Sequence, residues 1–127
     1  RESRLVEFAG ANNPLWISKG ESTTAESIIE IKGDKQPIGS FEHRKPFTNH
    51  SIQLEKGDSI YMFTDGFADQ FGGEKGKKFK YKPFRKLIAE NSNLPMEQQR
   101  THLDYSFEKW RGEFEQVDDI CLIGVRL

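Results

Sequence analysis

Residues 59–69 read Ser-Ile-Tyr-Met-Phe-Thr-Asp-Gly-Phe-Ala-Asp, an apolar run that leads directly into an acidic residue and a glycine. Residues 59–63 are mostly β-branched and aromatic and follow a turn-forming Lys-Gly-Asp, which is typical of a buried strand ending near Thr64. An acidic side chain at the end of a central strand is held rigidly where ligands and metals gather. Gly66 lets backbone, an ion or substrate approach without a Cβ in the way. Asp65 is therefore the first candidate site residue.

An alternative interpretation is that residues 64–66 form only a strand-ending turn, because Asp and Gly are common turn residues. The C-terminal sequence favours a site instead. Asp118 and Asp119 immediately precede a second apolar run, residues 120–125. Two predicted strands thus each carry an acid at one end, and the nearly continuous apolarity of the second predicts that it lies deep in the sheet.

Length and charge bound the class of protein. The chain has 127 residues, which fits one domain with a buried core. With a net charge of −1, the chain as a whole has no electrostatic attraction for nucleic acid or anionic lipid. No apolar run is long enough to span a membrane, and the single Cys121 is predicted to be a small buried hydrophobe. These features predict a cytoplasmic protein. Residues 2–8 read as a strand already in progress after Arg1, so the sequence is expected to start inside a larger protein.

The rest of the sequence predicts short strands followed by two helices. Strands within residues 3–9 and at residues 15–18 flank a turn, which predicts a hairpin. Further short strands follow, at residues 27–32 and 51–54, and strands in succession predict an antiparallel sheet. Pro83 is predicted to lie in the first turn of one helix, and Pro95 to open a longer helix with a buried apolar stripe that ends at Gly112.

Residues 72–82 are rich in glycine and lysine and are predicted to form a mobile loop. Five lysines in residues 75–82 alternate with Phe79 and Tyr81, a pattern that would suit a phosphorylated partner or single-stranded nucleic acid. The alternative is a solvated surface flap.

The separated acids suggest divalent-metal chemistry. A two-metal hydrolase needs oxygen ligands on rigid supports, so that two hard ions bind close together and share a water. Asp65 and Asp118 suit this role, but two carboxylates cannot neutralise two divalent ions. Asp69 and Asp119 are further candidates by proximity, and each is as well suited to a turn or a cap. The three histidines are isolated, which argues against a zinc site.

Four ordered blocks resemble the metal-dependent protein phosphatases (PPM, type 2C), in particular the bacterial SpoIIE/RsbU branch. The blocks are Phe8–Leu15, Leu54–Asp58, Phe63–Asp69 and Asp118–Ile120. The resemblance implies an α+β fold in which antiparallel β-sheets are flanked by helices, a PPM-type α-β-β-α sandwich. It also implies two Mn²⁺ or Mg²⁺ ions between the sheets, with Asp65 and Asp118 as metal ligands. A metal-bridged water would then attack phosphoserine or phosphothreonine directly.

The resemblance covers only part of the family's domain. The family's Gly-Asp…Gly-His-Gly block, which supplies the other metal-binding acids, has no counterpart in residues 1–57. Residues 1–127 are therefore expected to be the C-terminal portion of the domain, with little or no activity alone. By analogy, the branch implies upstream sensor domains in the parent chain and phosphorylated anti-sigma-factor antagonists as substrates.

Other functions remain open. One is a non-catalytic interaction or sensory module with a degenerate phosphatase fold. Nucleic-acid binding through the lysines ranks last, and it would be lost at high salt. The expected partner is a phosphorylated protein, with neither nucleic acid nor membrane bound by this segment. A homodimer is also a candidate, because an incomplete sandwich would leave a sheet edge for a second copy to cover.

Overall fold

The structure is a computed structural model that describes residues 3–20, 24–40 and 42–127. Arg1 and Glu2, where the sequence predicts a strand already in progress, lie outside the described residues. The apolar run of the sequence forms the central strand, β5 (Ser59–Phe63), with the bounds that the sequence predicts.

A four-stranded antiparallel sheet is built around β5, in the order β3-β2-β5-β8. The other members are β2 (Leu15–Ser18), β3 (Ile29–Ile31) and β8 (Leu122–Arg126). A separate two-stranded ladder pairs β1 (Leu5–Phe8) with β4 (His50–Gln53), also antiparallel. The mixture of helices and antiparallel sheets confirms the predicted fold class.

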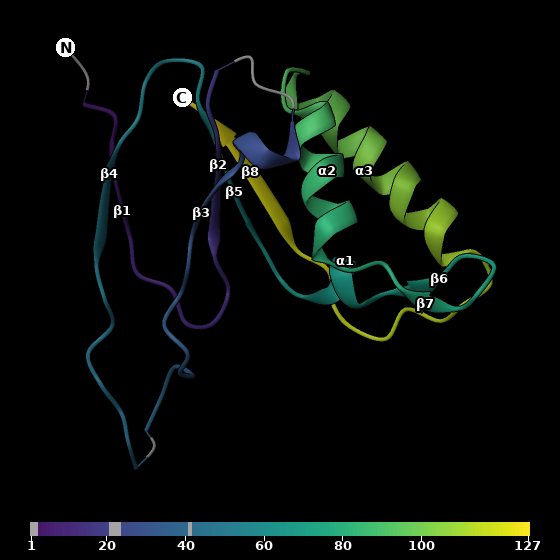
Figure 1. Ribbon diagram of the computed structural model, residues 1–127, viewed down its shortest axis with the longest axis horizontal. Helices are drawn as coiled ribbons and strands as arrows, with labels where there is room; N and C mark the ends of the chain where they lie inside the picture. The colour runs from purple at the N-terminus through teal and green to yellow at the C-terminus, as the bar shows by residue number, and fades with distance from the viewer. Residues whose placement is uncertain (1–2, 21–23, 41) are drawn as a thin grey trace.

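Helices cover one face of the four-stranded sheet (Figure 1). They are α2 (Tyr81–Asn91) and α3 (Met96–Arg111), with Pro83 in the first turn of α2, Pro95 before α3 and Gly112 after it, as the sequence predicts. The short elements are η1 (Ala25–Ser27), α1 (Gly66–Asp69), β6 (Phe71–Gly72) and β7 (Lys77–Lys78). Among the described residues, no helix combines the length and the apolarity needed to cross a membrane.

The layer between helices and sheet contains an aromatic core. Phe84 of α2 is fully buried, and its ring centroid lies 4.7 Å from that of Phe67, 5.0 Å from Phe63 and 5.4 Å from Trp16. Leu103 and Phe107 of the α3 apolar stripe belong to the same buried cluster. Every second side chain of a strand points to this face, and the aromatic side chains among them pack against the two helices.

The opposite face of the sheet packs against the β1–β4 ladder at its β2 side. Leu15 and Ile17 are buried there. Toward β8 the same face stays uncovered, and Met62, Ile123 and Val125 are 38%, 49% and 40% exposed. These three residues, called the apolar strip below, lie on paired strands, with Met62 opposite Ile123.

The hairpin predicted from residues 3–18 is wrong, because β1 and β2 belong to different layers. β1 pairs with β4, whereas β2 pairs with β3 and β5. The intervening loop is held by another loop instead of closing a ladder: Asn12, at φ 66°, donates its N–H to the Asp34 carbonyl (2.7 Å), and Asp34 donates to Gly10 (2.8 Å). These bonds fix the crossing between layers.

The predicted burial of the last strand is also wrong. β8 is an edge strand with one neighbour, β5, and most of its side chains are half-exposed or exposed. Cys121, predicted to be buried, is exposed just before the strand. Apolar composition alone does not distinguish a central strand from an edge strand whose outer face lacks its cover.

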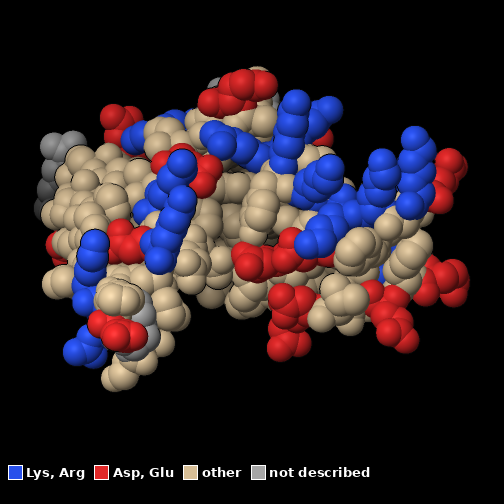
Figure 2. All heavy atoms as spheres, turned by 60° about the horizontal axis from the view of Figure 1, so that its bottom comes forward, with Lys and Arg blue, Asp and Glu red and all other residues tan. Residues whose placement is uncertain are grey.

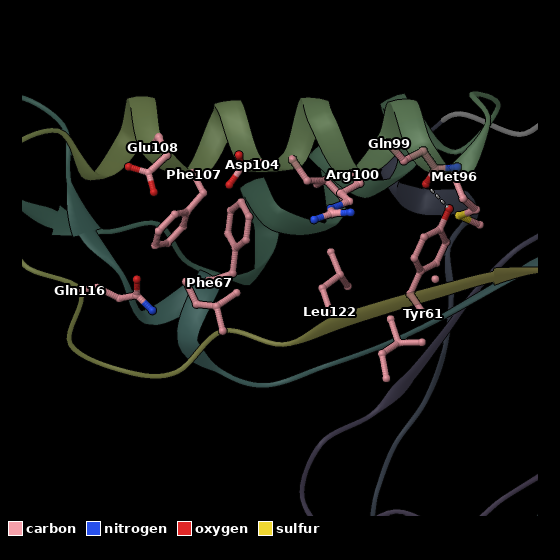
Figure 3. A pocket seen from close by; sticks show the side chains of 14 residues that line it. Tyr61, Phe67, Met96, Gln99, Arg100, Asp104, Phe107, Glu108, Gln116 and Leu122 are labelled. Carbon is pink, nitrogen blue, oxygen red and sulfur yellow. Dashed lines mark hydrogen bonds between the residues drawn. The ribbon is translucent and has the colours of Figure 1, made fainter.

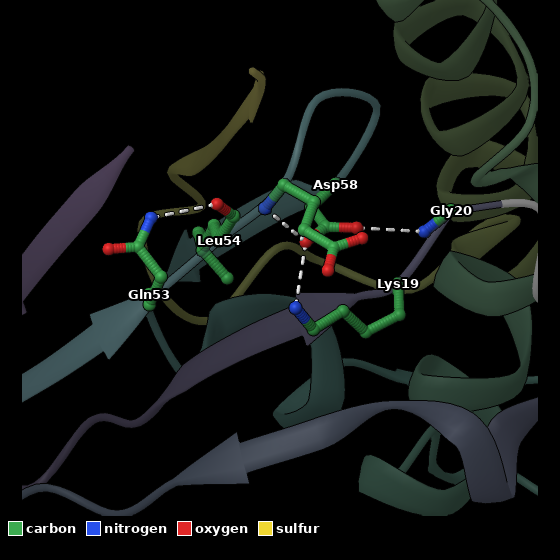
Figure 4. Close-up of polar contacts among 6 residues, drawn as sticks. Lys19, Gly20, Gln53, Leu54 and Asp58 are labelled. Atoms are coloured by element: carbon green, nitrogen blue, oxygen red, sulfur yellow. Dashed lines mark hydrogen bonds and ion pairs between the residues drawn. The ribbon is translucent and has the colours of Figure 1, made fainter. Parts of the chain in front are cut away.

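A buried carboxylate, Asp58, ties the start of β5 to the end of β2. Its oxygens accept hydrogen bonds from Lys19 Nζ (2.8 Å), Gly20 N (3.0 Å) and Glu55 N (2.8 Å) (Figure 4). Burial acts to raise the pKa of Asp58, but these hydrogen bonds and the Lys19 charge outweigh burial and hold the pKa below its ordinary value of 3.8. The folded state therefore stabilises the ionised carboxylate.

We expect Asp58→Ala to lower the free energy of unfolding at pH 7 by about 2–3 kcal/mol, because buried N–H donors lose a charged acceptor. Since the folded pKa is depressed, this contribution is present above about pH 4 and is lost as the pH falls through the folded pKa. Urea unfolding at pH 7 and at about pH 2.5 measures both effects. Asp104→Ala, which removes an exposed carboxylate of α3, is the control. A variant that differs equally from the parent at both pH values would contradict this account.

Candidate metal centre at the end of the central strand

The β5–β8 pairing continues past the end of β5 and brings two acidic loops together. Thr64 N donates to the Cys121 carbonyl (3.0 Å), Thr64 Oγ1 donates to the Asp119 carbonyl (3.0 Å), and Cys121 N donates back to Thr64 Oγ1 (3.0 Å). The loop that carries Asp65 and the loop that carries Asp118 therefore adjoin along their backbones. Residues far apart in the sequence meet here because β8 returns beside β5.

Gly66 makes this approach possible. A Cβ at this position would lie 2.3 Å from the Asp119 carbonyl oxygen and 2.8 Å from Ile120 Cγ1. Any side chain would therefore push the two acidic loops apart. Gly66 was predicted to admit backbone, an ion or substrate, and in this structure the neighbour is the backbone of Asp119.

Asp65 is exposed and lies directly before α1, and a tyrosine fixes its carboxylate. Tyr81, the first residue of α2, donates its hydroxyl proton to Asp65 Oδ1 at 2.7 Å. Burial, together with the neighbouring Asp65 carboxylate, raises the pKa of Tyr81 well above its usual range, so the phenol stays a neutral donor. Among the described residues no donor contacts Asp65 Oδ2, which leaves that oxygen for another ligand.

The backbone before Tyr81 is strained. Lys80 has φ 75° and ψ 162°, a region that residues other than glycine rarely adopt, at a cost of about 1–3 kcal/mol. Its N–H donates to the Ala68 carbonyl at 2.7 Å, which ties it to α1. The strained residue thus directs the start of α2 so that Tyr81 reaches Asp65. The sequence analysis missed this role, because Tyr81 was interpreted only as part of a lysine-rich loop.

The other candidate acids have local partners. Asp118 is exposed and accepts a hydrogen bond from Asp119 N on Oδ1 (2.8 Å). Asp69 Oδ1 lies 3.7 Å from Lys78 Nζ, whereas Asp119 bonds Thr64 through its backbone carbonyl and not through its carboxylate. Within residues 3–20, 24–40 and 42–127, no group of three or more metal-ligating side chains comes together.

Asp65 and Asp118 are the type of ligand that divalent metals prefer, but two carboxylates are too few to complete a metal site. Carboxylate oxygens are the donors that Mg²⁺ and Mn²⁺ favour, and both Asp65 and Asp118 are exposed on adjoining loops. Two carboxylates cannot by themselves complete an octahedral site. The assignment of Asp65 and Asp118 as metal ligands stays a prediction, and further ligands would have to come from outside the described residues.

A separate groove of about 580 Å³ runs between α3 and β8. Its floor is apolar, with Phe67, Phe107 and Leu122, and Tyr61 donates its hydroxyl proton to Gln99 inside it (2.8 Å) (Figure 3). Charged side chains, among them Arg100 and Glu108, line its edge. The groove lies beside the edge strand and contains neither predicted metal ligand.

The chain is similar to a known protein family and to several solved structures. The family model described as Stage II sporulation protein E (SpoIIE) matches residues 1–127. No curated protein matches the chain. Among solved structures, the SiaA-PP2C domain of Pseudomonas aeruginosa is 31% identical with a TM-score of 0.83, over 98% of this chain and 46% of that one. The chain thus spans about half the length of that domain.

Two further structures share the fold. The phosphatase domain of SpoIIE from Bacillus subtilis is 17% identical with a TM-score of 0.65, over 98% of this chain and 53% of that one. The RsbU and RsbW domains of a Mycobacterium tuberculosis protein are 16% identical with a TM-score of 0.71, over 98% of this chain and 32% of that one.

Proposed function

The chain belongs to the SpoIIE family of PP2C-type phosphatase domains, and we propose that it is the C-terminal portion of a domain that hydrolyses phosphoserine or phosphothreonine in proteins. The observation that carries the proposal is the backbone contact between the two acidic loops through Thr64 and Gly66. This contact brings the backbones of the Asp65 and Asp118 loops together, which supports the proposal that both carboxylates serve one metal site. A B. subtilis SpoIIE phosphatase domain presoaked with Mn has the same fold.

In the proposed reaction, Mn²⁺ or Mg²⁺ held by Asp65 and Asp118 would supply water activation and charge neutralisation. The residues of this chain would bind the ions and fix the orientation of the ligands. Asp65 offers Oδ2 as a ligand, while Tyr81 fixes the carboxylate through Oδ1. Gly66 keeps the Asp118 loop close, and β5 and β8 provide the rigid support that metal ligands need.

The remainder of the domain is proposed to cover the surfaces left open here. The apolar strip of Met62, Ile123 and Val125 and the groove beside β8 adjoin the free edge of the sheet. An apolar sheet face of this kind is normally packed against a second layer. Additional metal-binding acids would enter with that layer, which agrees with a chain that spans about half of a related domain.

Removal of metal tests the proposed function. The full-length protein that contains the chain should hydrolyse a phosphoserine peptide in Mn²⁺, lose the activity in EDTA and regain it on Mn²⁺ addition, because the ions supply the chemistry. Phosphate release measures the rate. Residues 1–127 alone should show no release above background. Activity that persists in EDTA would contradict the proposal.

An alternative function is favoured by one observation, the incomplete ligand set of the described residues. If the parent chain adds no further acids, the segment would be a non-catalytic interaction module of phosphatase fold. Mn²⁺ titration of the full-length protein by calorimetry separates the two, because only the phosphatase requires a saturable metal site.

A further inference from the structure

The strongest feature that the metal site leaves unexplained is the lysine arm, defined here as residues 75–82. It holds Lys75, Lys77, Lys78, Lys80 and Lys82 with no acidic residue between them, in a chain of net charge −1. Figure 2 shows Lys and Arg side chains gathered at the end of the molecule where Figure 1 places the β6–β7 hairpin, above a group of Asp and Glu. The arm is thus a local concentration of positive charge.

The lysine arm is not the mobile loop that the sequence predicted. β6 and β7 pair as a short hairpin, and Phe79 N donates to the Gln70 carbonyl at 3.0 Å. Trp110 of α3 anchors the hairpin through two hydrogen bonds. Its Nε1 donates to the Gln70 carbonyl (2.8 Å), and its backbone carbonyl accepts from Gly73 N (3.0 Å). A Cβ at Gly72 would lie 2.0 Å from that carbonyl. The lysines are therefore presented on a fixed support, which lowers the entropy lost on binding.

The arm borders the predicted metal site directly. Tyr81 within the arm bonds Asp65, Lys80 N bonds the Ala68 carbonyl, and Lys78 Nζ lies 3.7 Å from Asp69. A protein bound at the arm would therefore reach the site with its adjoining residues.

Most ammonium groups of the lysine arm form no ion pair with the described residues of the chain. Lys75, Lys77, Lys80 and Lys82 are exposed, and no ion pair engages them among the described residues. Exposed, unpaired charges of one sign attract a partner of opposite charge and raise its association rate.

The surroundings of the arm favour an acidic protein over nucleic acid. Binding of single strands relies on exposed aromatic rings for base stacking. Here the Phe79 ring is packed between Phe67 and Trp110, at 5.3 and 5.4 Å. The partly exposed rings of Phe71 and Tyr81 have partners within the fold: Lys78 Nζ lies 5.9 Å from the Phe71 ring centroid, and Tyr81 packs against Trp16 and Phe63 and donates its hydroxyl proton to Asp65. Lysines lack the planar fork with which arginine clamps a phosphate, so they suit a diffuse acidic surface.

We propose that the lysine arm docks the acidic surface surrounding the phosphorylated residue of a protein substrate, next to the metal site. This inference rests on the proposed phosphatase function and adds the class of substrate, a phosphoprotein whose phosphorylated residue lies among carboxylates.

The test compares three substrates of the full-length protein in Mn²⁺ at about 50 mM salt. They are p-nitrophenyl phosphate, a peptide with one phosphoserine flanked by glutamates, and the same peptide flanked by glutamines. For K77E/K82E we expect kcat/KM toward the glutamate peptide to fall about 10-fold, because two attractive charges become repulsive. The other two substrates should change less than about 2-fold, and about 0.5 M salt should remove the difference.

Lys56 provides the matched control, because it is an exposed lysine in the turn before β5, whereas Asp65 follows the opposite end of that strand. K56E should leave all three substrates within about 2-fold of the parent, and K77E alone should reduce kcat/KM for the glutamate peptide about 3-fold. An unchanged preference for the glutamate peptide in K77E/K82E would overturn the proposal.

Two further outcomes are distinguishable. Tight binding of a fluorescein-labelled oligo-dT by the unaltered protein, lost in K77E/K82E, would overturn the proposal in favour of a nucleic-acid site. Failure of the unaltered protein to hydrolyse p-nitrophenyl phosphate would contradict the proposed function instead. Fluorescence anisotropy of the labelled glutamate peptide would then test docking by the lysine arm without catalysis. Weaker binding by K77E/K82E than by the unaltered protein would support docking, and equal binding would overturn it.

Discussion

We expect Asp65→Asn to reduce phosphoserine hydrolysis by the full-length protein at least about 100-fold, equivalent to about 2.7 kcal/mol of lost transition-state stabilisation. Asparagine keeps an oxygen that can accept the Tyr81 hydroxyl, as Asp65 Oδ1 does at 2.7 Å. The substitution therefore removes the negative charge that a divalent ion needs and leaves the local structure intact. Phosphate release measures the loss, and calorimetric Mn²⁺ titration should show weaker binding.

The control for this substitution is Glu97→Gln, which removes an exposed carboxylate at the start of α3. It lies at the far end of the sheet, where Arg126 of β8 bonds the Leu94 carbonyl. Its activity should stay within about 2-fold of the parent, as for most surface changes. Full activity of Asp65→Asn, or of Asp118→Asn, would exclude these carboxylates as ligands.

The second large effect concerns stability. Phe84→Ala should lower the free energy of unfolding by about 3–5 kcal/mol, because the ring is fully buried and its removal leaves a cavity among Trp16, Phe63 and Phe67. For a chain of this size the melting temperature should fall by about 10–20 °C. Differential scanning calorimetry measures both quantities.

Tyr105→Ala on α3 is the matched control, since this ring is 66% exposed. It should change the free energy of unfolding by less than about 0.5 kcal/mol. Equal destabilisation by the two substitutions would show that the aromatic cluster is not the principal core.

Local patterns in the sequence were sufficient for the elements that depend on neighbours along the chain. The strand at residues 59–63 and its end before Thr64 follow from composition and turn residues, and the helix starts follow from Pro83 and Pro95. The two acidic loops were likewise identified from their place beside apolar runs. The structure then brought these loops into backbone contact through Gly66.

Features set by distant contacts were not predictable from local pattern. The local pattern of residues 3–18 favours a hairpin, and only the bonds of the Asn12 loop to Asp34 show that the chain changes layer. The rigidity of residues 72–80 depends on Trp110, which lies far along the chain. Tyr81 reaches Asp65 because Lys80 adopts a backbone conformation normally reserved for glycine, which its residue type does not signal.

The pairing of β5 with β8 has a consequence for how the protein forms during synthesis. β5 and the Asp65 loop leave the ribosome well before β8, with both major helices in between. Such long-range pairing closes late, after the local helices and turns have formed. Until the last strand docks, the central strand keeps an open edge and the two aspartates stay apart. A nascent chain therefore cannot bring the two acidic loops together early, and a chaperone that shields the β5 edge would protect it from aggregation.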